Sequence, residues 1–114
     1  PSRFVQAAFF CSTAPMGNTG FDAVTQAFHI LNQFDIPIGA QHQKSMVPEG
    51  LPSATQFTVA IDQKGMKLYY RTAWNMNIRC VELKGIDFKN CKYQIRPLDQ
   101  SRVQPVEILK WHNS

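Results

Sequence analysis

The sequence predicts an α+β fold in which two helices are followed by an antiparallel β-meander. In the first 36 residues, apolar side chains recur at steps of three or four, which is the period of a helix. From residue 54 the apolar period changes to two, which is typical of strands that bury one face. Apolar residues make up 44% of the 114 residues and charged residues 18%, so the composition indicates one packed segment, 1–114, rather than a disordered tail.

The first helix is expected at residues 3–11. Phe4, Val5, Ala8 and Phe9 lie at spacings of one and four, which places them on one face of a short helix. The same continuous run of apolar residues also permits a buried strand. A loop should follow, because Pro15 begins a stretch that also holds two glycines and an asparagine.

The second helix is expected at residues 19–35. Thr19 and Asp22 have the spacing of a helix N-cap with an acidic partner in the first turn. Pro37 should end the helix, because proline restricts the residue before it and cannot donate a helical hydrogen bond. His29 falls on the polar face and is therefore most simply a surface histidine. The apolar stripe consists of Phe21, Val24, Phe28, Leu31 and Phe34.

Residues 38–53 contain two glycines and two prolines with few large apolar side chains, so we expect a long surface loop. Strands should follow at 54–61, 66–74 and 78–84, with a tight turn at Asp62 to Gly65. A last strand is expected at 103–111, and Pro105 would confine it to a sheet edge because proline has no N–H for the ladder.

The net charge is +4, and ten of the twelve basic residues lie from Lys64 onward. These residues are spread out and mixed with Asp and Glu, which favours solvated strand and turn positions over a phosphate-binding patch. We therefore expect no nucleic-acid partner. No run of about 18 apolar residues occurs, so we expect no membrane span.

No complete catalytic set can be read from the residues. The sequence contains no GxSxG, P-loop, HExxH or GxGxxG motif. Cys11, Cys80 and Cys91 are an odd number of cysteines without CxxC spacing, so a disulfide framework is not expected and at least one thiol should be free. The three histidines lie far apart and form no metal signature, so neither a metal nor another cofactor is predicted.

A resemblance to a known family sharpens this picture. Residues 1–9, PSRFVQAAF, resemble the SRFVRAAF stretch of choloylglycine hydrolases and penicillin V acylases. The segments AFHIL at 27–31 and IPIG at 36–39 are similar to the following helix and its exit. The segments KLYYRT at 67–72 and NIR at 77–79 are similar to the closing hairpin, YYRTYDNxxIR. Two departures, Gln6 and the Trp-Asn-Met at 74–76, put substrate detail in doubt more than the resemblance itself.

The resemblance implies the C-terminal part of an αββα N-terminal-nucleophile hydrolase. In this family a cysteine at the start of the mature protein attacks a linear amide, with its own α-amino group as the base. No residue of this chain matches that cysteine, and we expect the missing N-terminal part of the same hydrolase as a partner. Arg3 matches the arginine that reaches the nucleophile, so it is the one candidate catalytic residue. The alternative substrates are conjugated bile salts, penicillin V and acyl-homoserine lactones.

The resemblance also leaves the compartment open between cytoplasm and periplasm, and a homo-oligomer is expected. Two other functions compete with the hydrolase. The first is a non-catalytic structural or oligomerisation domain that covers its apolar faces by self-association. The second is a sheet that stacks single-stranded nucleic acid on Tyr69, Tyr70 and Trp74. Strand alternation argues against the second, because Tyr69 and Tyr70 would point to opposite faces.

Overall fold

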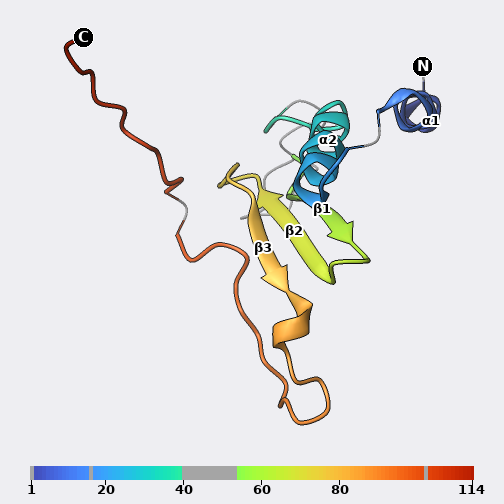
Figure 1. Ribbon diagram of the computed structural model, residues 1–114, viewed down its shortest axis with the longest axis vertical. Coiled ribbons are helices and arrows are strands. Elements are labelled where there is room, and N and C mark those ends of the chain that lie inside the picture. Colours follow the sequence, from blue (N-terminus) through green and yellow to red (C-terminus); the bar gives the residue numbers. More distant parts are fainter. Residues whose placement is uncertain (1, 16, 40–53, 102) are drawn as a thin grey trace.

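The computed structural model describes residues 2–15, 17–39, 54–101 and 103–114 (Figure 1). It confirms the α+β prediction, because two helices precede a three-stranded antiparallel sheet of order β1-β2-β3. The elements are α1 (Arg3–Thr13), α2 (Gly20–Asn32), β1 (Phe57–Asp62), β2 (Lys67–Thr72), β3 (Arg79–Glu82) and a 3₁₀ turn, η2 (Leu83–Gly85).

Helix α2 forms the small core together with the sheet. Its N-terminus has a capping box, in which the Thr19 hydroxyl accepts from the Asp22 N–H at 3.1 Å and the Asp22 carboxylate accepts from the Thr19 N–H at 3.2 Å. Val24 and Phe28 of the expected stripe are buried, at 7% and 4% exposure. The helix ends three residues earlier than expected, because residues 33–35 form a turn with tighter, i to i−3 hydrogen bonds.

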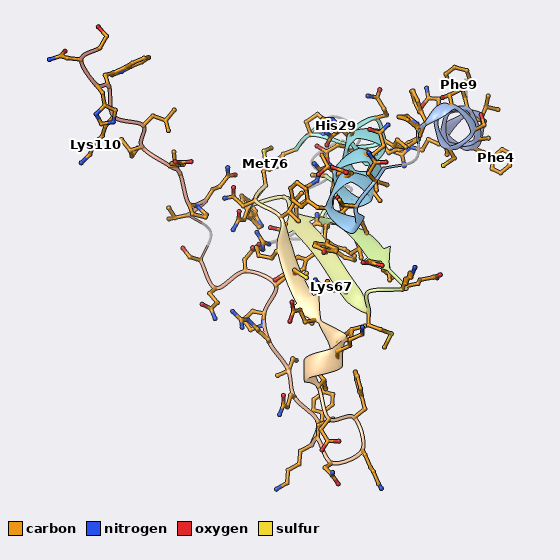
Figure 2. The ribbon with its side chains drawn as sticks, viewed as in Figure 1. Phe4, Phe9, His29, Lys67, Met76 and Lys110 are labelled. Carbon is orange, nitrogen blue, oxygen red and sulfur yellow. The ribbon has the colours of Figure 1, made fainter. Side chains whose placement is uncertain are left out.

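Helix α1 was also predicted correctly, but it packs very little. Its N-cap is Ser2, whose hydroxyl accepts from the Val5 N–H at 3.3 Å. None of its residues is buried, and Phe4 and Phe9 are 82% and 61% exposed. Figure 2 shows both rings directed away from the rest of the molecule. The apolar face that predicted this helix therefore has no cover among the described residues.

Strands β1 and β2 form the predicted hairpin, with Phe57 opposite Thr72 and Asp62 opposite Lys67. The turn between them is fastened by the Asp62 carboxylate, which accepts from the Gly65 N–H at 2.8 Å. A side chain at Gly65 would collide with that carboxylate, so a substitution there would displace the Asp62 side chain. Met66, with φ of 56°, takes the left-handed conformation that starts β2.

The two faces of the sheet are covered to different extents by the rest of the described chain. Arg71 lies on the face under α2, where its guanidinium carbon is 5.3 Å from the centroid of the Phe28 ring. The strand register puts the larger apolar side chains on the opposite face. We call this the open face; its aliphatic and phenylalanine side chains are Phe57, Val59, Ile61, Leu68 and Val81, and Tyr70 and Thr72 lie on the same face but are buried. Phe57 and Ile61 are 57% and 62% exposed there.

The predicted strand at 103–111 was wrong for this sheet, because residues 103–111 form no strand in the structure. Pro105 has no N–H for a ladder, and its carbonyl accepts from the Asn77 side chain at 3.1 Å instead of from a strand. Figure 1 shows the chain after η2 turning back past β3 and then running on as an extended tail. Most of the predicted loop at 38–53 lies outside the described residues, but its flanks meet, because the Thr55 N–H donates to the Ile36 carbonyl at 3.1 Å.

The chain is much more open than its mass predicts. Its accessible surface is 10080 Å², whereas a compact chain of 13.0 kDa exposes about 6,300 Å². Its radius of gyration is 17.7 Å, against about 13 Å for a compact domain of this length. None of the helices that the structure describes is long and apolar enough to cross a membrane.

Candidate functional site

The predicted catalytic residue, Arg3, begins helix α1 and lies beside the C-terminal end of α2. Its guanidinium donates from Nη2 to the Phe34 carbonyl at 3.3 Å. The last carbonyls of a helix lack helical partners and carry partial negative charge, so a cation is favourable there. This contact positions an exposed, permanently charged donor group just past α2.

A cleft of about 500 Å³ lies next to the same end of α2, between its exit and the start of the hairpin. It has one acidic and one basic side chain, Asp35 and Arg71, among otherwise neutral groups. Arg71 is held by its contact with Phe28. Arg3 does not line this cleft. On the side formed by the sheet and its flanking residues, the cleft is lined by Thr55, Thr58, Arg71, Thr72 and Ala73.

A second hollow of about 500 Å³ lies between α2 and β1, and it is lined mainly by apolar side chains. Cys11 is among the residues that line it, and no histidine does. His29 is exposed on α2, as expected. All three cysteines are free and exposed. In the described ranges no group of three His, Cys, Asp or Glu could hold a metal ion.

The most highly connected polar cluster joins the sheet to the C-terminal tail. The Asp99 carboxylate accepts from the Thr72 hydroxyl at 2.6 Å and from Arg79 Nη2 at 2.8 Å. The Tyr70 hydroxyl donates to the Leu98 carbonyl at 3.0 Å, and the Arg79 guanidinium carbon lies 4.7 Å from the Tyr70 ring centroid. The Arg79 and Asp99 side chains are only 24% and 14% exposed, so water screens this ion pair weakly.

Sequence reasoning missed this cluster. Arg79 was interpreted as one of the solvated basic residues, yet it also donates from Nη1 to the carbonyls of Asn75 and Asn77, at 3.1 and 3.2 Å. Its carboxylate partner is 20 residues away in a segment without a recognisable period. The one local signal in the sequence was a β-branched residue together with a charged residue near a turn. This combination is too common in proteins to predict a buried ion pair.

The strand register separates the two tyrosines that a nucleic-acid platform would use. Tyr69 is opposite Ala60 on the helix face, whereas Tyr70 is opposite Val59 on the open face. Tyr70 is also buried, at 9% exposure, beneath the Leu98 segment. The two rings therefore cannot form one stacking surface.

A turn after η2 holds a carboxyl group with a shifted pKa. The Asn90 side chain donates to Asp87 Oδ2 at 2.8 Å and lowers the pKa of the Asp87 carboxyl. Desolvation raises this pKa in part, and the backbone N–H groups of Asn90 and Lys89 lower it further. This carboxylate is fully exposed and fastens a turn, so it is a structural group rather than an acid or base for chemistry.

Comparisons with known proteins agree with the resemblance in the opening stretch and the closing hairpin. A protein-family model described as linear amide C–N hydrolases, choloylglycine hydrolase family, matches residues 1–96. An uncharacterized protein of Paramecium bursaria Chlorella virus 1 is 33% identical over 79 residues. That match takes in 68% of this chain but 28% of the viral protein, so the chain spans less than a third of this relative.

Proposed function

This chain belongs to the choloylglycine hydrolase family of linear amide C–N hydrolases, and from this premise we propose that it is the C-terminal portion of such an enzyme. In this proposal a cysteine carried by an N-terminal portion attacks the amide carbon, and Arg3 assists. The substrate is a linear amide of the bile-salt-conjugate or penicillin V type, or an acyl-homoserine lactone. The assembled enzyme is a homo-oligomer that needs no cofactor.

The observation that carries the proposal is the one-sided cover of the sheet. Helix α2 lies on one face, while on the other face the side chains of Phe57 and Ile61 are 57% and 62% exposed. Two-layer sheet packing buries such faces against each other. The αββα arrangement that the family implies needs a second sheet on the open face, and this chain leaves room for one.

Arg3 has the chemistry that the proposal requires. A guanidinium stays charged at any physiological pH, so it can lower the pKa of a nearby thiol and favour the thiolate. As the thiolate attacks the amide carbon, negative charge moves to the carbonyl oxygen, and a fixed donor stabilises that oxyanion. An α-amino group, with an ordinary pKa of about 7.7–8.0, can take the thiol proton and return it to the leaving amine. Water then hydrolyses the thioester.

The first test is a denaturing intact-mass spectrum of the purified protein together with everything that copurifies. We expect a second, larger polypeptide with an N-terminal cysteine, and hydrolysis of at least one of the three substrate types. In that active material Arg3→Ala should lower turnover by about 10² or more, the size expected when one oxyanion donor is lost. Arg96→Ala removes an exposed arginine of the tail and should leave turnover unchanged.

Two results contradict the proposal. Turnover of the Arg3→Ala variant close to that of the unchanged protein would remove Arg3 from the mechanism. Purification of this chain alone, without amide hydrolysis, would favour the second candidate, a non-catalytic structural or oligomerisation domain. The observation that favours this second candidate is that no histidine lines the hollow at Cys11, so this thiol lacks the imidazole base that would activate it.

A further inference from the structure

The C-terminal tail ends in an apolar segment that nothing in the described chain covers. We define residues 106–111, with the sequence VEILKW, as the C-terminal arm. Ile108, Leu109 and Trp111 are 79%, 76% and 98% exposed. Figure 2 places Lys110 of the arm well away from the sheet. Four large apolar residues in a six-residue segment are unusual for an exposed extended chain, so we expect the arm to bind a surface.

The root of the arm contacts the turn that precedes β3. The Met76 N–H donates to the Gln104 side chain at 3.4 Å, and the Asn77 side chain donates to the Pro105 carbonyl at 3.1 Å. Both contacts join residues 28 positions apart. A constant separation means that the two segments run parallel. One cleft continues this alignment, because Ile78 and Arg79 line it together with residues 105–107.

The outer edge of β3 is free to receive a strand. Strand β3 is the last strand of the sheet, and its partner β2 pairs with one side only. Among the described residues, no backbone hydrogen bond joins another segment to the outer side of Cys80, Val81 or Glu82. Unpaired N–H and C=O groups along such an edge are a ready template for another extended segment.

The alignment that the root establishes also matches the arm to β3 in charge and polarity. Continued by the same separation of 28, it places Glu107 beside Arg79, Leu109 beside Val81 and Lys110 beside Glu82. Both charged pairs are of opposite sign, and the apolar pair extends the open face. The Arg79 Nε–H has no partner in the described part of the chain, so Arg79 can bind Glu107 while it keeps Asp99.

We propose that the free edge of β3 is the docking site of the C-terminal arm, which closes onto it as a parallel fourth strand. Residues 83–105 provide the connection, and parallel pairing needs roughly a dozen residues or more. The structure holds the open form, with the root engaged and the arm extended. In the closed form the arm shields β3 from pairing with other chains. This inference does not depend on the proposed hydrolase function.

Hydrogen exchange of the full chain tests the proposal, with a synthetic peptide of residues 104–114 as the unprotected reference. We expect arm amides to exchange more slowly in the chain than in the peptide. Lys110→Glu should reduce this protection about two- to fivefold, the effect of one exposed ion pair. The double variant Lys110→Glu with Glu82→Lys should restore it. The variants are expected to fold, because the Lys67–Glu82 pair that is lost is largely exposed, at 3.8 Å.

The control is Lys92→Glu, which makes the same charge change on an exposed tail residue and should leave protection unaltered. Arm amides that exchange as fast as those of the peptide would overturn the proposal. Protection that rises with protein concentration would overturn it as well, because the arm would then bind a second copy rather than its own β3. A double variant no better protected than Lys110→Glu alone would reject the predicted alignment and the docking site with it.

Discussion

The helix face and the open face of the sheet belong to the same three strands, yet their environments differ sharply. On the helix face, Phe28 of α2 is 4% exposed against Arg71. On the open face, Phe57 and Ile61 of β1 are more than half exposed, whereas Tyr70 and Thr72 of β2 are buried beneath the Leu98–Asp99 segment. Along β1, the larger apolar side chains therefore lie on the less covered face. Burial of Phe57 and Ile61 against another layer would add hydrophobic stabilisation that the described residues do not provide.

The largest expected effect contrasts one phenylalanine from each side. Phe28→Ala should lower the free energy of unfolding by about 3 kcal/mol or more, because it opens a cavity in the small core. Phe57→Ala removes a ring that is 57% exposed and should cost less than about 1 kcal/mol in this chain alone. Urea unfolding followed by circular dichroism measures both. Equal costs would show that the open face is covered in solution.

An intermediate effect is expected where the tail covers the end of the open face. Asp99→Asn keeps the shape but removes the charge that Arg79 and Thr72 bind, so we expect a loss of about 1–3 kcal/mol. Glu82→Gln is the matched change in the exposed pair with Lys67 and should cost less than about 1 kcal/mol. The comparison is made by chemical unfolding. It fails if the two substitutions have the same effect.

The smallest effect lies outside both faces, in the turn of Asp87. Its pKa is lowered from the ordinary value of 3.8, mainly by the hydrogen bond from the Asn90 side chain. A lowered pKa in the folded chain means that the contribution to stability is present above pH 3.8 and is lost as pH falls through the folded pKa. Asn90→Ala should raise the pKa toward the ordinary value, and an NMR titration of the carboxyl carbon measures it. An unchanged pKa would assign the effect to the backbone N–H groups.

Local patterns were enough to predict the elements of the structured half. Thr19 and Asp22 predicted the start of α2, because a capping box joins two residues that are three positions apart in the sequence. The alternation of apolar and polar residues after residue 54, together with the turn at Gly65, predicted the hairpin. Arg3 was placed correctly at the start of a helix. These features depend on neighbours along the chain, which is the information that a single sequence holds.

Relations between distant segments could not be predicted in the same way. The cluster of Tyr70, Thr72, Arg79 and Asp99 joins residues 20 to 28 positions apart, and no periodicity marks Asp99 as its centre. The strand at 103–111 was predicted as an edge strand because of Pro105, but strand pairing depends on a partner edge that the local sequence does not identify. Likewise, the pattern of β1 predicted one buried face without saying what would bury it. The role of Arg3 in catalysis stays a prediction.

The distance in sequence between Asp99 and its partners has a consequence for biosynthesis. The ribosome makes Thr72 and Arg79 before it adds Asp99, 27 and 20 residues later. The residues leave the ribosome in the same order, so at about 5–20 residues per second the emerged part of the chain lacks this carboxylate for roughly one to five seconds. During that interval the Asn75 and Asn77 carbonyls and the Tyr70 ring can already hold the guanidinium in position. The hairpins can therefore form as they are translated, with the tail fastened to them last.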